Sequence, residues 1–330
     1  MNRAQTKPAM DQPGWKGSIL RFWQRSYAAD YLGYVLLQVA YFGSKLLIVP
    51  FKRYFTLSEP AIAYPFAVVE RVSGVQNIIY AGLCPLVFFM IYSLVVRPGF
   101  HKSHVTILGF IISITLTSLV TDIIKNSVGR PRPDLIDRCK PAPGTSPTGI
   151  LTIDVCTASH GPVLQDGWRS FPSGHSSFSF SGLGYLTLWL GGQLHVLRPR
   201  TDLARVLVAL APSMGALLVA LSRMADYRHD VYDVTCGSLL GILVAWFSYR
   251  RYFRRLRDPK CDLPYPSRAD VASRQGLLVG GKRDLEEQRI RSAEEFELDD
   301  LASSEDEARP LTAERESSES GKGKATKPDG

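Results

Sequence analysis

The chain has a net charge of +8 and 330 residues. This length suits one large domain or two small ones. Its mean hydropathy is near zero, but that average combines charged ends with an apolar middle. The five cysteines include no Cys-x-x-Cys pair and no Cys/His metal-binding spacing, which excludes the common structural zinc sites. The composition therefore indicates a membrane domain between two polar ends rather than a soluble protein.

After the polar residues 1–30, apolar runs separated by short polar stretches extend to residue 250. A bilayer core requires roughly 20 apolar residues in a helix, and each run is close to that length. The fourth and sixth runs contain many small and polar residues, which favours packing inside a bundle over contact with lipid. We therefore predict an all-α, polytopic membrane protein with a six-helix bundle in residues 31–250, its spans at approximately 31–51, 76–96, 104–124, 175–191, 203–222 and 231–249.

Basic residues flank the bundle at both ends, in residues 3–25 and in residues 250–257. Because positively charged flanks stay in the cytosol, both termini are expected there and the loops 52–75, 125–174 and 223–230 on the opposite side. Cys139 and Cys156 share the second of these loops. In an oxidising compartment they could form a disulfide. The sequence leaves that pairing and two separate thiols as open alternatives.

The C-terminal segment 251–330 is basic near the last apolar run and acidic further on. Residues 250–283 hold ten basic and three acidic side chains, whereas residues 284–307 hold eleven acidic side chains and two arginines. This pattern is typical of a membrane edge, so membrane lipids rather than nucleic acid are the expected contacts. Few aromatic residues occur beyond residue 261, which predicts a disordered cytosolic tail.

The first motif with chemical meaning leaves the third apolar run and contains Lys125, Arg132 and Pro133. Taken alone, it is typical of a lysine that extends to the membrane surface and a basic interfacial loop. However, the rings of Pro131 and Pro133 restrict the backbone, and cations held in fixed positions suit a phosphate group.

The second motif, Phe171-Pro-Ser-Gly-His175, opens the fourth run. Ser173 is a typical helix N-cap. A helix start also offers backbone N–H groups and the positive end of the helix dipole to an anion. Gly174 allows an anion to approach the backbone, and His175 adds a titratable group. A cap and an anion site are therefore compatible interpretations.

The third motif lies between the fifth and sixth runs and contains Arg223, His229 and Asp233. The histidine and the aspartate are four residues apart, so we expect them to share a helix face and to hydrogen-bond. A carboxylate on one imidazole nitrogen makes the other a better nucleophile. The three motifs fall on the same predicted side of the membrane, which indicates one phosphate site with an acid and a nucleophile.

The strings Lys125-x6-Arg132-Pro133, Pro172-Ser-Gly-His175 and Ser222-Arg-x5-His229-x3-Asp233 resemble the three-part signature of the type 2 phosphatidic acid phosphatases, or lipid phosphate phosphatases. Residues 129–139 and 55–66 are similar to fungal diacylglycerol pyrophosphate phosphatases. The resemblance covers about residues 25–255. It implies metal-independent removal of phosphate from diacylglycerol pyrophosphate, phosphatidate and related lipids, in an endomembrane such as that of the vacuole.

The resemblance also implies roles for individual residues. His229, oriented by Asp233, would attack phosphorus and form a phosphohistidine, and His175 would protonate the leaving group. No cofactor is implied. Apart from the resemblance, Asp166 and Arg169 are expected to shape the loop beside Ser173 without a chemical role. The residues expected to bind the phosphate oxygens are Lys125, Arg132, Ser173, Gly174 and Arg223.

Two alternatives remain open at this level. His175, His229 and Asp233 could be metal ligands, although three cations in the same pocket would repel a divalent ion. The chain could also be a six-span transporter or channel for phosphorylated solutes, with the same cations and no nucleophile. Chemical groups at one membrane face rather than the midplane disfavour a transporter. The main substrate and the oligomeric state do not follow from the sequence.

Overall fold

The computed structural model describes residues 26–159 and 161–267, together with Trp15, Ser18, Ile19, Phe22, Trp23, Asp270, Val271 and Glu286. Within these residues the secondary structure is helical, with isolated β-bridges and no strand. The all-α prediction is therefore confirmed for the described part of the chain. Most of the predicted N-terminal segment 1–30 and most of the predicted tail 251–330 lie outside the described residues.

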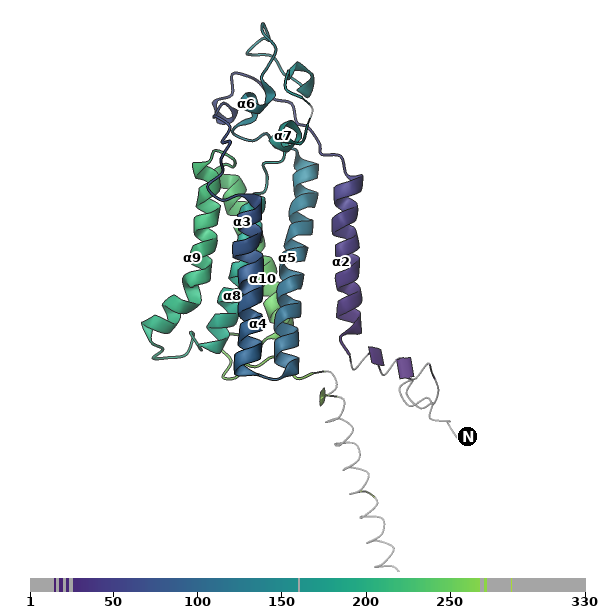
Figure 1. Ribbon diagram of the computed structural model, residues 1–330, viewed down its shortest axis with the longest axis vertical. Helices are drawn as coiled ribbons and strands as arrows, with labels where there is room; N and C mark the ends of the chain where they lie inside the picture. Colours follow the sequence, from purple (N-terminus) through teal and green to yellow (C-terminus); the bar gives the residue numbers. More distant parts are fainter. Residues whose placement is uncertain are drawn as a thin grey trace, which may run out of the picture. The chain divides into compact units, whose positions relative to one another are not determined.

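Long helices form the body of the protein and lie side by side in Figure 1. Their starts and ends agree closely with the predicted apolar runs. The second run is one continuous helical segment in three parts, α3, η3 and α4, where η3 is a π-helical turn just before Pro85. The bounds are α2 Ala28–Leu47, α3 Gly74–Ile78, η3 Ile79–Leu83, α4 Cys84–Val96, α5 Phe100–Val128, α8 Gly174–Gln193, α9 Leu203–Ala225 and α10 Val231–Tyr252.

Among the described residues, 4 helical segments are long and apolar enough to cross a membrane: Gly74–Val96, Phe100–Val128, Leu203–Ala225 and Val231–Tyr252. The other two, α2 and α8, do not reach that apolarity. Helix α2 carries Asp30 and Lys45, and α8 is rich in serine and glycine. The protein is thus a membrane protein, and the count of six spans stays a prediction.

Helix α8 packs in the interior of the bundle, against α5, α9 and α10. Most of its serines and glycines are buried, as expected for the fourth run. On α10, a Cβ added to Gly237 would lie 2.6 Å from the Ser173 carbonyl oxygen, and one added to Gly241 would lie 2.4 Å from that of Ser177. These glycines permit the close approach of α10 to α8, which brings the second and third motifs together.

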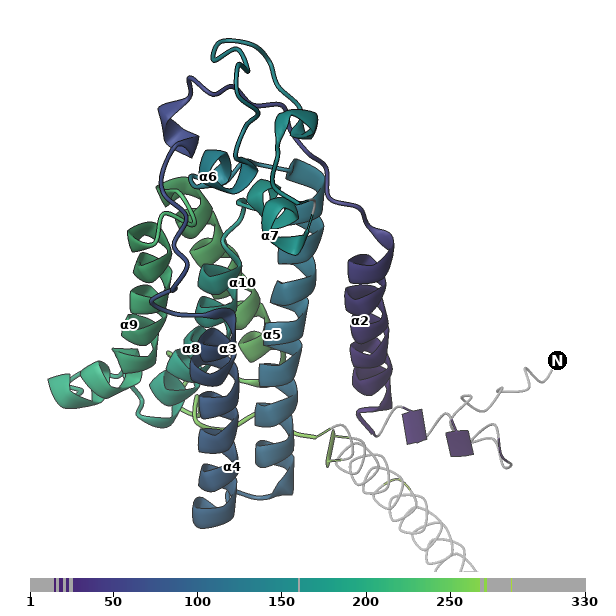
Figure 2. The ribbon, with the colours of Figure 1, turned by 45° about the horizontal axis from the view of Figure 1, so that its top comes forward.

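Two loops, residues 48–73 and 129–173, cover one end of the bundle, which we call the loop end (Figure 2). They contain the short helices η2 (Pro60–Ile62), α6 (Leu135–Cys139), η4 (Ile153–Val155), α7 (Pro162–Gln165) and η5 (Asp166–Trp168). A separate apolar core holds them together. Its buried members include Phe55, Ile62, Leu135, Leu164 and Trp168. The loops are therefore an ordered cap over the bundle.

Cys139 and Cys156 form a disulfide within this cap, 17 residues apart in the sequence. We expect its removal to lower the free energy of unfolding by about 3 kcal/mol, because the bond restricts a loop of this length in the unfolded chain. Thermal unfolding in detergent, with and without reductant, measures the effect. Reductant should not change the stability of a Cys139→Ser/Cys156→Ser variant. An equal response in that variant would assign the effect to another cysteine.

Candidate active site

Lys125 occupies the last turn of α5 and is 7% exposed. The helix ends at Val128, and its C-cap residue Gly129 has a φ of +58° and lies so close to Phe51 that only glycine fits. The Lys125 ammonium donates to the carbonyl oxygen of Arg169 at 2.6 Å. Its Cε is 3.4 Å from the position that a Cβ on Gly174 would take. The lysine therefore points into the protein beside the start of α8, and the alternative of a lysine extending to the membrane surface is wrong.

Arg132 is buried and is held by Asp166. Its Nε donates to the Asp166 carbonyl oxygen at 2.9 Å, and its Nη2 donates to Oδ1 of the same residue at 3.0 Å. Burial alone would raise the pKa of the Asp166 carboxyl, but the guanidinium groups of Arg132 and Arg138 outweigh it and hold that pKa well below its usual range. Asp166 therefore stays ionised and orients a predicted phosphate-binding cation, a role beyond the loop-shaping one expected from the sequence.

The second motif begins α8 as predicted. The Ser173 hydroxyl accepts from the Ser176 amide at 3.4 Å and caps the helix, and Gly174 is the first helical residue. The Ser173 amide donates to the Asp233 carbonyl oxygen at 2.9 Å, which ties α8 to α10. His175 follows, and its buried Nε2 makes no hydrogen bond to the described residues. Its imidazole lies beside the backbone of Ser73 and within electrostatic range of Arg223 and Arg132.

His229 and Asp233 are adjacent in space, but they do not share a helix face. Helix α10 begins at Val231 with Asp230 as its cap, so His229 precedes the helix. Its Nδ1 is 3.6 Å from Asp233 Oδ2, which is longer than a hydrogen bond. The Ser170 hydroxyl donates to that same Oδ2 and lies 3.5 Å from His229 Nδ1. The expected direct hydrogen bond is therefore wrong in detail, because a serine lies where the two side chains meet.

The other oxygen of Asp233 is also satisfied, since Arg130 Nη1 donates to Oδ1 at 2.8 Å. Sequence analysis missed both Arg130 and Ser170. Arg130 lies inside the first motif, so its position was a usable signal. Nothing in the sequence around Ser170 indicates that its hydroxyl meets residues about sixty positions away.

The His229 side chain is enclosed, with 4% of the residue exposed. Burial lowers its pKa well below the usual value, and the positive charges of Arg132 and Lys125 lower it further. The imidazole is therefore neutral at neutral pH and keeps a nitrogen lone pair. His175 also contributes to this shift, which places the two histidines within electrostatic range of each other.

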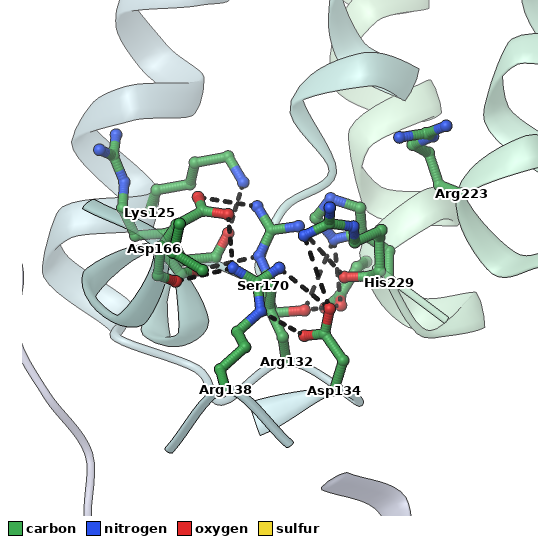
Figure 3. Close-up of polar contacts among 12 residues, drawn as sticks. Lys125, Arg132, Asp134, Arg138, Asp166, Ser170, Arg223 and His229 are labelled. Atoms are coloured by element: carbon green, nitrogen blue, oxygen red, sulfur yellow. Dashed lines mark hydrogen bonds and ion pairs between the residues drawn. The ribbon is translucent and has the colours of Figure 1, made fainter. Parts of the chain in front are cut away.

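Arg223 does not join this cluster directly. It is 1% exposed and forms ion pairs with Glu70 and Asp226, each at 2.8 Å. Figure 3 shows its guanidinium apart from the contacts that link Lys125, Arg132, Asp166, Ser170 and His229. The structure therefore brings two of the three predicted cations together with His229, and it pairs the third with carboxylates.

A cavity of about 420 Å³ reaches His229 and Asp233. Arg130, Tyr64 and Tyr227 line it, and the two tyrosine rings are stacked with centroids 4.5 Å apart. Water and a small anion fit such a space. Within the described residues, no group of three or more His, Cys, Asp or Glu side chains is arranged to hold a metal ion.

In a helical membrane protein, a buried neutral imidazole beside fixed cations is suited to the class of proteins that transfer phosphoryl groups. Consistent with that class, residues 106–257 match the family described as the PAP2 superfamily. The chain belongs to this superfamily, as the three motifs indicated. Both the predicted family and the predicted class of enzyme, a membrane phosphatase for lipid phosphates, are confirmed at this level.

Three relatives named as lipid phosphatases each match between 64% and 74% of the chain. The chain is 40% identical over 232 residues to diacylglycerol pyrophosphate phosphatase 1 of Saccharomyces cerevisiae, which covers 69% of this chain and 80% of the yeast protein. It is 38% identical to the probable diacylglycerol pyrophosphate phosphatase 1 of Schizosaccharomyces pombe, and this match covers 74% of this chain and 87% of the relative. Lipid phosphate phosphatase 2 of Arabidopsis thaliana is 35% identical, and this match covers 64% of this chain and 74% of the plant protein.

Proposed function

We propose that this protein removes the terminal phosphate from diacylglycerol pyrophosphate, phosphatidate and related lipid phosphates, without a metal ion and through a phosphohistidine on His229. The observation that carries the proposal is the convergence of Lys125, Arg132 and a buried neutral His229 from segments about a hundred residues apart in the sequence. A neutral imidazole among fixed cations is suited to attack a phosphoryl group whose negative charge the cations balance.

The reaction has two steps. In the first, a His229 nitrogen attacks phosphorus, the N–P bond forms, and the P–O bond to the lipid breaks while His175 protonates the departing oxygen. In the second, water attacks the phosphohistidine, His175 takes a proton from that water, and inorganic phosphate leaves with the N–P bond broken. Asp233 and Ser170, both in contact with the Nδ1 side of His229, support assignment of the other nitrogen, Nε2, as the nucleophile.

The remaining predicted residues bind the phosphate oxygens in this proposal. Lys125 and Arg132 are already oriented by Arg169 and Asp166 and act as fixed charges. Gly174 contributes an amide of the first turn of α8, where amides have no partner within the helix. Ser173 acts mainly through its cap, which sets the direction of that turn. Arg223 joins them only when substrate is bound.

Phosphate release from a panel of lipids by the purified protein tests the proposal. The panel contains diacylglycerol pyrophosphate, phosphatidate, lysophosphatidate, and a sphingoid and an isoprenoid phosphate, each with excess chelator. We expect release from the first two to persist in chelator. Complete loss in chelator would favour the metal alternative. Binding of the lipids without release from any of them would favour a transporter.

The low pKa of His229 predicts how activity depends on pH. An imidazole with an ordinary pKa near 6.5 would be about tenfold less available at pH 5.5 than at neutral pH. We expect kcat/KM, corrected for ionisation of the substrate, to fall by less than about threefold over that interval, because His229 protonates only at lower pH.

The Lys125→Met variant serves as the comparison. It removes a positive charge that lowers the His229 pKa, so the acid limb of its residual activity should move to higher pH. An acid limb near pH 6.5 in the wild-type enzyme, unmoved in the variant, would contradict the assignment of this histidine as the titrating nucleophile.

We also propose that the loop end faces the lumen of an endomembrane compartment, most specifically the vacuole, with both termini in the cytosol. Basic residues on both flanks of the bundle support this orientation. The Cys139–Cys156 disulfide supports it as well, because disulfides persist in oxidising compartments. Epitope tags are placed at both termini of the protein, and intact vesicles that carry it are treated with protease. Removal of both tags is expected, and protection of both tags would contradict the orientation.

A further inference from the structure

The segment that leads into α3 brings an additional carboxylate to the predicted site. Glu70 Oε2 accepts from Arg223 Nη1 at 2.8 Å, and its Oε1 accepts from Arg228 Nη2 at 2.8 Å. One carboxylate is thus shared by two buried arginines. Glu70 lies outside all three motifs, and 153 residues separate it from Arg223.

Arg223 has other partners that would keep it in place without Glu70. Its Nη2 donates to Asp226 Oδ2 at 2.8 Å, and its Nε donates to the Ser222 hydroxyl at 3.1 Å. Asp226 is itself fixed, because the Arg71 amide donates to it at 3.0 Å. The Asp226 side chain is 5% exposed, whereas that of Glu70 is 26% exposed. Of the two carboxylates, Glu70 is the one with room to move.

The same segment adjoins the proposed acid. Its continuation to Ser73 places a backbone group beside the His175 imidazole, and Arg223 lies within electrostatic range of that imidazole. A phosphoryl group whose leaving oxygen meets His175 therefore arrives within electrostatic range of Arg223, a guanidinium that already holds a carboxylate. A phosphate group carries more charge and more acceptor oxygens than a carboxylate, so it can replace one on arginine.

We propose that Glu70 occupies Arg223 in the empty site and is exchanged for the phosphoryl group when substrate binds. This inference rests on the proposed function of the site. The exchange makes and breaks hydrogen bonds only. It brings Arg223 to the phosphoryl group during the reaction, and the return of Glu70 to Arg223 favours release of inorganic phosphate.

Binding of orthovanadate, a phosphate analogue, tests the exchange without requiring activity. We expect Glu70→Gln and Glu70→Ala to bind vanadate about 10-fold more tightly than the wild type, because a charged competitor for Arg223 is lost. Calorimetry on the detergent-solubilised full chain measures the dissociation constant, and the melting temperature verifies folding. Asp154→Asn is the matched control, since it removes a cap carboxylate that accepts a hydrogen bond from the Thr152 hydroxyl at 2.7 Å. Its affinity should stay within about twofold of the wild type.

A double-mutant cycle separates exchange from a general charge effect. In an Arg223→Gln background, adding Glu70→Gln should give no gain in vanadate affinity, because the guanidinium for which the two anions compete is absent. A gain of the same size in that background would overturn the exchange. Unchanged or weaker vanadate binding by both single Glu70 variants would also overturn it, and would show that Glu70 only positions Arg223.

The outcomes also distinguish this inference from the proposed function. A wild-type protein that hydrolyses lipid phosphates, with no gain in vanadate affinity in the Glu70 variants, contradicts the exchange alone. A wild-type protein that binds vanadate and releases no phosphate from any lipid contradicts the proposed function. Failure of the wild type and of both Glu70 variants to bind vanadate contradicts the exchange, and phosphate release from the lipid panel then decides the proposed function by itself.

Discussion

Replacing His229 by alanine is expected to reduce phosphate release from a lipid phosphate by roughly 10³-fold or more, because no other group can form the covalent intermediate. The side chain is enclosed, and its neutral nitrogen faces cations that would balance the charge of the phosphoryl group. Rate measurements on the purified variant, together with trapping of labelled phosphoenzyme from labelled substrate, give the result. The wild type should carry the label, and the variant should not.

His195→Ala is the matched control. His195 follows the opposite end of α8, where it contacts Cys261, and it lies outside the proposed machinery. Its substitution should leave the rate within about twofold, as is usual for sites remote from a reaction centre. Substantial activity in His229→Ala, or labelled phosphoenzyme in that variant, would refute a phosphohistidine at this position.

The second large effect is expected at Arg132. Replacement by glutamine should lower kcat by about 10²- to 10³-fold, the usual result of removing one preorganised donor from a developing anion. A smaller change in KM should accompany it, because the interaction strengthens as charge moves in the transition state. Steady-state kinetics on a soluble short-chain lipid phosphate separate the two parameters.

Two further variants help to interpret that result. Arg205→Gln removes an arginine whose ion-pair partner is Asp202, near the start of α9, and should leave both parameters unchanged. Asp166→Asn keeps the cation but loses its ionised partner, so we expect a loss smaller than that of Arg132→Gln. An Arg132→Gln enzyme with kcat within about threefold of the wild type would exclude a direct role for this guanidinium.

The sequence was most informative where a local pattern is enough. Apolar runs predicted the long helices, because a helix in a bilayer must satisfy its backbone internally over a fixed length. Small residues in the fourth run predicted its burial. The sixth run, α10, is only partly buried, since Leu239, Leu243 and Trp246 are exposed. Gly237 and Gly241 explain why α10 nevertheless approaches α8 so closely. The N-cap at Ser173 was also correct, since a cap depends on only a few adjacent residues.

Local reasoning failed where it assumed too much regularity. Placing His229 and Asp233 on one helix face was wrong, because the capping box of Asp230 and Asp233 starts α10 after the histidine. Reading Lys125 alone as a surface lysine was wrong for a related reason. Burial of its ammonium depends on the Arg169 carbonyl in a distant loop.

The sequence by itself determined the residue types of the site and the order of the helices that carry them, because both depend on short-range periodicity and motif spacing. Only the tertiary structure decided how those groups are paired. Ser170 meets Asp233, Asp166 orients Arg132, and Glu70 occupies Arg223 across 153 residues of chain. Such pairings depend on how distant loops pack in the cap, and no local pattern encodes that packing.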